Sequence, residues 1–369
     1  MARRLLLLNG LATLGVVLNH AASWVFTGMF WWADRYRDVA VPNFDLIGSP
    51  AYFVIRFLEQ LIAFTVPSFL AVSGFFIAFV AGREPVSTRW TQAGKRVWSL
   101  LIPYAVWTTV ILAERALTGT RYSISRYAVI YLVGGASPPY YYVPLLAQCL
   151  LLSPLIIEWG KRHWFSLLLV TGGVQLGVLS TWYLVYLGWH GPVVDAVVAA
   201  TTGWYLPGRI FWFVAGVVTA LHLEGCQQHL ARYRAVYLSA AVLLLLAGMV
   251  EWETLRRYST LDWVPYYDTA LDSLYAASAV CAIVAFSHLA PRSIEGLQTL
   301  GRYSYGVYLL HSIVLEYAAR AAAKLVPGLL AQPVVFLAYL FALGLGLPLL
   351  MMRMVRESKL RAAYPYLFG

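Results

Sequence analysis

Long apolar runs alternate with short charged segments along the whole chain of 369 residues. Many of these runs continue for about twenty residues, the length at which a helix crosses the hydrocarbon core of a bilayer. Strands of a membrane barrel would instead alternate apolar and polar positions. We therefore predict an all-α membrane protein with about ten transmembrane helices. Their predicted ranges are 5–27, 52–81, 97–117, 141–159, 164–187, 204–222, 235–252, 269–290, 303–322 and 333–352.

The composition supports a multi-pass membrane protein, since 60% of the residues are hydrophobic, 12% are charged and the mean hydropathy is +0.68. In soluble domains about a quarter of all residues are charged. The formal net charge of +10 does not indicate a nucleic-acid partner, because the basic residues are spread over short loops. With the N-terminus inside, the inside segments hold sixteen lysines and arginines and the outside segments nine. This bias predicts that both termini are cytoplasmic. The location that we expect is the inner (plasma) membrane of a bacterium.

No linker, repeat or low-complexity tract divides the chain, so residues 1–369 are predicted to form a single domain without an extra soluble domain. The first apolar run follows two arginines, as in a signal peptide, but it is too long for one and we expect an uncleaved first span. The three cysteines, Cys149, Cys226 and Cys281, are widely spaced. They predict neither a disulfide framework nor a metal site.

His20 is the one ionisable side chain between Leu5 and Trp24. At about 1.5 Å per residue it lies about 24 Å from Arg4, in the outer part of a hydrocarbon core about 30 Å thick. His311 is a second membrane histidine, about 13 Å from Arg302. Such residues mark a site or cap a neighbouring backbone. Solvation near loops or span ends accounts for the other five histidines, His163, His190, His222, His229 and His288.

Two arginines, Arg56 and Arg209, fall within or at the edge of spans. Each should pair with an acid or a ligand anion, or snorkel to the headgroups. The acidic residues in the spans are Glu59, Glu114, Glu158, Asp268, Asp272 and Glu316. We expect Asp272 and Glu316 to be buried and Glu158 to be interfacial.

Residues 118–140 contain a run that is too short to span the membrane and predicts an interfacial or re-entrant segment, which Pro138 and Pro139 interrupt. Tyr140, Tyr141 and Tyr142 follow it. An aromatic belt at the membrane surface is the simpler interpretation of the tyrosines, with a sugar-binding platform as the alternative. A loop before the third span carries Arg83, Arg89, Lys95 and Arg96. Topology alone would produce this cluster, although it could also bind the phosphates of a nucleotide-bearing cofactor.

Four stretches in fixed order resemble the acyltransferase-3 family of membrane acyltransferases, over about residues 5–355. The family pattern has a histidine at the end of the first helix, an SGF motif, a basic residue followed by proline and tyrosine, and an SY-x-x-YL-x-H motif. The matching stretches are LATLGVVLNH, FTVPSFLAVSGFFIAF, KRVWSLLIPYAVW and LGRYSYGVYLLHSIV.

The resemblance implies a ten-helix bundle that moves an acyl group, most often acetyl from acetyl-CoA, to a hydroxyl of a surface polysaccharide or lipid-linked glycan. It implies that His20 is catalytic, as a general base or as a covalent acyl carrier, with His311 as a second polar site. The donor phosphates would meet the four basic residues before the third span. The acceptor would meet Arg56, Arg209, Tyr141 and Tyr142. Membrane lipid and the machinery of exopolysaccharide synthesis or export are the expected partners.

The chain departs from the family pattern at Asn9, where the family has an arginine eleven residues before the histidine. Asn9 and His20 share a helix face about 16 Å apart, so Asn9 is expected at the donor end of the site. The fourth span also has YYYVPLLAQ where the family has a histidine, a tryptophan and a glutamate. A glycan exporter without acyl transfer is therefore the alternative function, and a structural membrane subunit is a weaker one.

Overall fold

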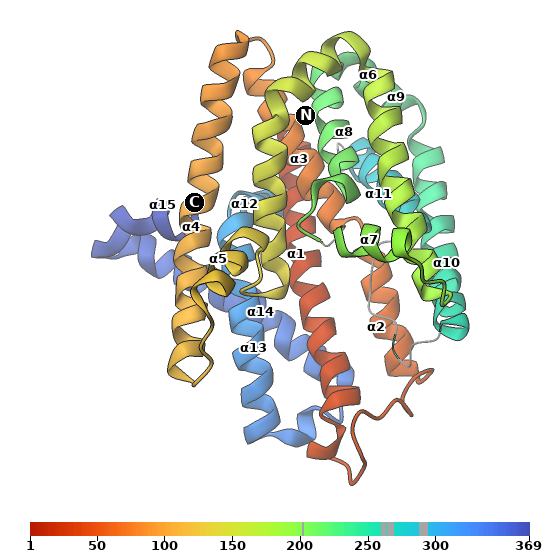
Figure 1. Cartoon of the computed structure of the whole chain (residues 1–369), viewed down its shortest axis with the longest axis vertical. Coiled ribbons are helices and arrows are strands. Elements are labelled where there is room, and N and C mark those ends of the chain that lie inside the picture. Colours follow the sequence, from red (N-terminus) through yellow and green to blue (C-terminus); the bar gives the residue numbers. More distant parts are fainter. Residues whose placement is uncertain (201–202, 260–262, 264–268, 288–293) are drawn as a thin grey trace.

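A computed structural model describes residues 1–200, 203–259, 263, 269–287 and 294–369 of the chain (Figure 1). All regular elements of this described part are helical, as predicted. Asp268, His288 and Arg292 lie outside it. The α-helices are α1 (Ala2–Phe26), α2 (Pro50–Leu61), α3 (Thr65–Ala81), α4 (Val86–Leu117), α5 (Ile124–Val133), α6 (Tyr142–Tyr186), α7 (Pro192–Ala200), α8 (Ile210–Leu221), α9 (Leu223–Arg232), α10 (Arg234–Tyr258), α11 (Ala270–Phe286), α12 (Glu295–Arg302), α13 (Ser304–Leu325), α14 (Pro333–Glu357) and α15 (Tyr364–Phe368). Shorter turns are η1 (Thr27–Trp31), η2 (Ala33–Arg35), η3 (Pro138–Tyr141), η4 (Leu206–Gly208), η7 (Pro327–Leu329) and η8 (Lys359–Ala363).

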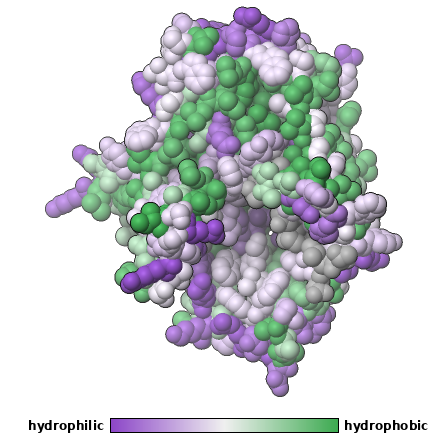
Figure 2. Space-filling model, viewed as in Figure 1, coloured by the Kyte–Doolittle hydropathy of each residue, from purple (hydrophilic) through white to green (hydrophobic). Residues whose placement is uncertain are grey.

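Among the described residues, six helical stretches are long and apolar enough to cross a membrane, or seven if the bent pair α8–α9 counts as one span. One helix, α6, covers two predicted spans, and its backbone leaves helical geometry at His163 between them. Figure 2 shows apolar side chains over a broad part of one face and strongly hydrophilic ones along its upper rim. The all-helical membrane fold is thus confirmed, while the count of ten spans and the cytoplasmic termini stay predictions.

The first helix runs through the middle of the bundle and packs against α3, α12, α13 and α14 (Figure 1). Glycine permits the closest of these approaches, because a side chain at Gly10 would collide with the carbonyl of Leu297 on α12. Gly74 of the SGF motif does the same between α3 and α8, where a side chain would collide with the carbonyl of Phe213. This part of the family motif therefore serves helix packing.

The segment before the third span is not a loop, because α4 begins at Val86 directly after Pro85. Proline favours a helix start, and no further proline interrupts the segment before Pro103. Arg89 is buried there, with its guanidinium 3.0 Å from the carboxylate of Glu158 and 2.8 Å from the carbonyl of Glu84. The interaction joins α4 to α6.

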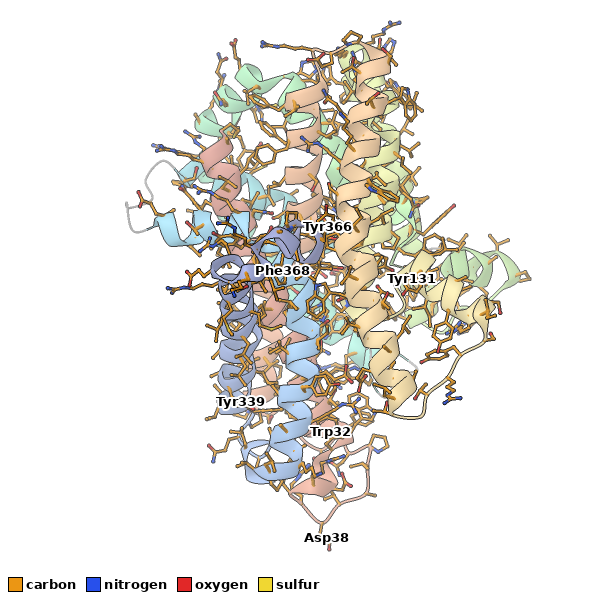
Figure 3. All side chains as sticks on the ribbon, turned by 90° about the vertical axis from the view of Figure 1, so that its left-hand side faces the viewer. Trp32, Asp38, Tyr131, Tyr339, Tyr366 and Phe368 are labelled. Carbon is orange, nitrogen blue, oxygen red and sulfur yellow. The ribbon has the colours of Figure 1, made fainter. Side chains whose placement is uncertain are left out.

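The C-terminal end of the chain packs back onto α4, as the labelled residues of α15 show in Figure 3. The indole of Trp107 donates a hydrogen bond to the carbonyl of Leu367, 2.8 Å away, and its ring stacks on Phe368. Nearby, the hydroxyl of Tyr305 donates to the carbonyl of Leu100, 2.5 Å away. These contacts hold the beginning of α13 beside α4, about one turn after Arg96.

Candidate active site

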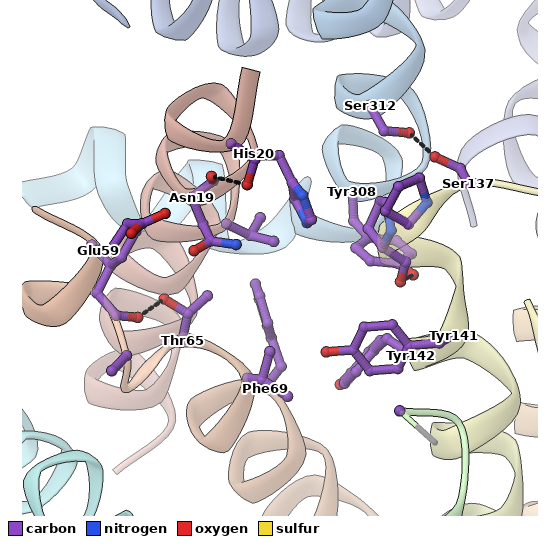
Figure 4. A pocket seen from close by; sticks show the side chains of 18 of the residues that line it. Asn19, His20, Glu59, Thr65, Phe69, Ser137, Tyr141, Tyr142, Tyr308 and Ser312 are labelled. Carbon is purple, nitrogen blue, oxygen red and sulfur yellow. Dashed lines mark hydrogen bonds between the residues drawn. The ribbon is translucent and has the colours of Figure 1, made fainter. Parts of the chain in front are cut away.

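A cavity of about 870 Å³ opens between α1, α2, α3, α6 and α13. Along α1 and η1 its wall extends from Val16 to Trp31, and the α-helical part from Val16 to Phe26 is about 15 Å long. Figure 2 shows the surface hollowed below its middle, and Figure 4 shows polar side chains facing one another across the interior. The cavity brings together five of the residues predicted from the sequence, His20, Arg56, Tyr141, Tyr142 and Arg209.

His20 and His311 lie next to each other, although the sequence places them at different depths. Their ring centroids are 5.2 Å apart, with 43° between the ring planes. The two histidines reach the same depth in the bundle because α13 begins beside Asn9 rather than beside Arg4. The hydrogen bond between Asn9 and Ser304 shows this position. His20 lines the cavity, and His311 lies behind it with no exposed surface.

The imidazole of His311 is held by its own helix. Its Nδ1 lies 2.7 Å from the carbonyl oxygen of Tyr308 and 3.2 Å from that of Val307. A carbonyl only accepts, so Nδ1 carries the proton and Nε2 is an acceptor in the neutral ring. Within the described residues this Nε2 atom has no hydrogen-bond partner.

Arg56 does not snorkel, because only 4% of it is exposed and its guanidinium lies 2.7 Å from the carboxylate of Glu59. The rings of Trp252 and Trp263 lie 4.5 and 4.6 Å from the guanidinium carbon, and Phe26 and Tyr52 complete an aromatic cage. Cation–π contacts and the adjacent carboxylate offset the cost of burying this charge. Glu59 is 3% exposed and contributes to the cavity wall.

The tyrosines predicted for a membrane belt are inside the bundle. Tyr140 is fully buried, and its hydroxyl donates to the carbonyl of Leu309, 2.7 Å away. Tyr142 is also buried and lines the cavity. The belt interpretation is therefore wrong for these two residues, since belt aromatics face the lipid interface. Tyr141 faces the cavity and accepts a hydrogen bond of 2.6 Å from Arg209.

The segment before α6 is fastened to α13 by further hydrogen bonds. The hydroxyls of Ser137 and Ser312 lie 2.9 Å apart, as Figure 4 shows. The hydroxyl of Tyr308 donates to the carbonyl of Pro139. Because α13 also carries His311, these hydrogen bonds connect this wall of the cavity to the helix of that histidine.

Several cavity residues were missed by the sequence interpretation. Asn19 and Ser23 of α1 and Thr27 of η1 line the cavity together with His20, and their spacing of four residues could have revealed a polar stripe. No local pattern could have found the others, because different elements supply them. They include Trp24, Trp31, Glu59, Thr65, Ser137, Trp182, Trp263, Ser312 and Glu316.

The two acids that were expected to be buried have different surroundings. Asp272 is 3% exposed and accepts a hydrogen bond of 2.7 Å from Gln60, which confirms its burial. The side chain of Glu316 is 37% exposed and lies 2.5 Å from Arg320, one turn further along α13, so its predicted burial is wrong. It lines the cavity together with Tyr308 and Ser312, which precede it by two turns and one turn on the same face of α13.

The residues predicted for the donor do not line this cavity. The side-chain amide of Asn9 donates to the carbonyl of Gly301 at 2.8 Å and to the hydroxyl of Ser304 at 2.9 Å. It therefore joins α1 to the junction of α12 and α13. Arg83 and Lys95 are exposed, Arg96 is half-buried, and Arg89 is bound to Glu158.

A second cavity of about 230 Å³ lies at the start of α13, between α12, α14 and α15. Arg353 and Arg356 contribute two guanidinium groups to its wall. Arg356 donates to the hydroxyl of Tyr303, and Arg353 lies 2.9 Å from Glu357. The net positive charge suits an anion, although both arginines already have partners.

The main cavity combines an imidazole with hydroxyls, amides, a carboxylate and aromatic faces. Its volume lies in the range of small-ligand sites, about 300–1,000 Å³. Aromatic faces with polar groups between them can accommodate a sugar ring, and an imidazole can remove a proton from one of its hydroxyls. Within the described residues, no group of three or more histidine, cysteine, aspartate or glutamate side chains could hold a metal ion.

Comparison with known proteins adds one finding to this geometry. An acyltransferase-3 family model, described as an acyltransferase domain, matches residues 5–353. No curated protein and no solved structure matches the chain. The family match covers α1 to α14, including both histidines and the main cavity.

Proposed function

We propose a reaction for this chain from the premise that it belongs to the acyltransferase-3 family and is an integral membrane acyltransferase. In this reaction it transfers an acetyl group from acetyl-CoA to a hydroxyl of a surface polysaccharide or lipid-linked glycan. The observation that carries the proposal is the position of His20 in the wall of the large cavity. With the predicted orientation, this cavity lies in the outer half of the membrane, where a glycan acceptor would enter.

His20 acts as the general base in this proposal. Its neutral imidazole accepts the proton of the acceptor hydroxyl while the oxygen attacks the thioester carbonyl. The tetrahedral intermediate then releases the CoA thiolate, and the imidazolium returns the proton to sulfur. A covalent acyl-histidine would use the same residue as a nucleophile, with the acyl group passing from sulfur to nitrogen and then to oxygen.

The acceptor binds among the aromatic and polar side chains of the main cavity. Trp24, Trp31 and Trp182 present faces on which the apolar side of a sugar can stack. Glu59 and Asn19 can hydrogen-bond to its hydroxyl groups. Arg56 supports this role indirectly, because its contact of 2.7 Å with Glu59 holds that carboxyl group in place in the cavity wall.

The phosphates of the donor bind at the beginning of α4 in this proposal. Lys95 and Arg96 carry most of the interaction, since Arg89 is already bound to Glu158, and Arg83 lies further out in the turn before α4. The start of α13 lies beside Leu100, and His311 follows Tyr305 by about 9 Å of helix. Arg96 lies about one turn before Leu100, so a donor anchored there has about 15 Å of helix length to cover to reach the histidines.

A charge-reversal comparison tests the donor site. We expect Lys95→Glu combined with Arg96→Glu to raise the KM for acetyl-CoA about tenfold, a loss of about 1.4 kcal/mol in binding. Arg353→Glu combined with Arg356→Glu is the matched variant at the second cavity. If the KM for acetyl-CoA rises tenfold in the Arg353→Glu, Arg356→Glu variant and not in the Lys95→Glu, Arg96→Glu variant, the donor phosphates bind at the second cavity.

Mass spectrometry of the host's surface polysaccharide tests the function itself. Deleting the gene should remove one acetyl increment per modified sugar, and the wild-type gene should restore it, whereas a His20→Ala gene expressed at the same level should not. An exporter would instead alter the amount of polysaccharide at the surface without altering its mass. Unchanged acetylation in the deletion strain would overturn the proposal.

A further inference from the structure

We infer that His311 is a positioning residue that selects the tautomer of His20, by accepting a hydrogen bond from one nitrogen of the His20 ring. The other nitrogen of His20 then keeps its lone pair and faces the cavity as the base. The inference rests on the proposed function for its catalytic consequence. The tautomer itself can be measured without any acyl transfer.

The first step of the argument is the protonation state of His311. Its Nδ1 atom lies within hydrogen-bond distance of two carbonyl oxygens, at 2.7 and 3.2 Å. Both oxygens belong to the preceding turn of α13, so the helix itself holds the proton on Nδ1. The neutral ring therefore presents a lone pair at Nε2.

The second step is that this lone pair is buried. His311 has no exposed surface, and Nε2 has no hydrogen-bond partner in the described part of the chain. A buried acceptor without a partner costs free energy, and such atoms in native proteins call for an explanation. A donor that reaches Nε2 during the working cycle removes this cost.

The third step identifies that donor. The ring of His20 lies 5.2 Å from that of His311, centroid to centroid, while the ring of Tyr308 lies 6.0 Å away and its hydroxyl already donates to Pro139. Because the helix holds the His311 ring, a modest rotation of the His20 imidazole is the movement that brings one of its nitrogens within reach of Nε2. His20 is neutral with one N–H, so donating it to His311 leaves the second nitrogen unprotonated.

This arrangement prepares the base before the substrate arrives. When His20 takes the proton of the acceptor hydroxyl, the imidazolium keeps its hydrogen bond to Nε2, and the proton later passes to the thiolate without moving through His311. His311 cannot take over as the base, because it lies behind His20 and does not line the cavity. It thus acts through His20 rather than on the acceptor.

Kinetics of three variants test the catalytic consequence in proteoliposomes with labelled acetyl-CoA. His311→Leu removes the acceptor and should lower kcat ten- to a hundredfold with an unchanged KM for the glycan. His311→Gln retains an acceptor oxygen and should recover part of that loss. His229→Leu makes the same type of change at an exposed histidine on α9 and should behave as the wild type. Equal kcat for His311→Leu and the wild type would overturn the inference.

Nitrogen NMR of ¹⁵N-histidine-labelled protein in nanodiscs tests the tautomer directly. The His20 signals are assigned by their loss in His20→Gln. Wild-type protein should show a single neutral tautomer of His20, and His311→Leu should show a mixture of both. A His20 tautomer that stays the same in His311→Leu would overturn the inference, even if activity falls. Retained acetylation by His20→Ala would instead overturn the proposed catalytic role of His20 and leave the tautomer result standing.

Discussion

Asn9 and Asn19 lie on the same helix, yet their side chains meet opposite surroundings. The amide of Asn9 donates two hydrogen bonds to the α12–α13 junction, next to the glycine contact at Gly10. Asn19 faces the cavity beside His20, as Figure 4 shows. The N-terminal half of α1 is therefore a packing surface with satisfied polar groups, and the C-terminal half is a site with polar groups left for a ligand.

The difference shows how a membrane helix can combine stability and function. Polar groups in hydrocarbon are costly unless they are bonded, so a side chain like Asn9 stabilises the fold by joining helices. The polar stripe around His20 costs free energy because it places polar side chains along a membrane helix. Close glycine packing elsewhere in the fold offsets this cost. Substitutions in the two halves of α1 should accordingly affect different properties.

His20→Ala should have the largest effect on the cavity half of α1. Loss of a general base lowers kcat by about 10²–10⁴-fold, because proton removal from the hydroxyl is no longer assisted. Labelled acetyl transfer in proteoliposomes measures this change, and His229→Ala serves as the control. The thermal midpoint should fall only by the amount that the loss of one hydrogen bond, the one to His311, implies, about 1 kcal/mol. Wild-type kcat would exclude His20 as the base.

Gly10→Val should have the largest effect on the packing half. The new side chain would collide with the carbonyl of Leu297, a backbone atom that cannot rotate away. Overpacking of this kind costs about 1–3 kcal/mol or more, so we expect poor expression or a thermal midpoint several degrees lower. Gly173→Val on α6 is the control, because a side chain there would meet open space. Equal midpoints for both variants would contradict the close contact between α1 and α12.

Asn9→Ala should destabilise the protein by about 1–3 kcal/mol, because the carbonyl of Gly301 and the hydroxyl of Ser304 lose their donor. Thermal unfolding in detergent measures the loss. The KM values for donor and acceptor should stay within twofold of the wild type. If the thermal midpoint is unchanged and the KM for acetyl-CoA is raised, Asn9 belongs to the donor site, as predicted from the sequence.

Asn19→Ala, the same substitution in the cavity half, should have the smallest effect on the fold. It should raise the KM for the glycan by up to about tenfold, equivalent to about 1.4 kcal/mol, through the loss of a hydrogen bond to a sugar hydroxyl. Its thermal midpoint should match that of the wild type. A midpoint as low as that of Asn9→Ala would abolish the distinction between the two halves of α1.

Much of the candidate site was predictable because burying a polar group in a membrane is expensive. His20, Arg56 and Arg209 stand out in apolar runs for that reason, and all three line the cavity. Glu59 was visible as an acid in a span, but its pairing with Arg56 depends on the aromatic cage, which α1 and α10 help to form. The ion pair between buried Arg89 and partly exposed Glu158 joins residues 69 positions apart, and no local sequence pattern predicts it.

By itself the sequence determined the all-helical membrane architecture, because about twenty consecutive apolar residues leave the backbone no alternative to helical hydrogen bonds. It also determined the family and the candidate base, through ordered motifs and one histidine in an apolar run. Only the tertiary structure decided that His311 lies behind His20, that Asn9 joins helices and that Tyr140 and Tyr142 are buried. These features depend on how far the helices shift along one another, and that shift is set by contacts between distant segments.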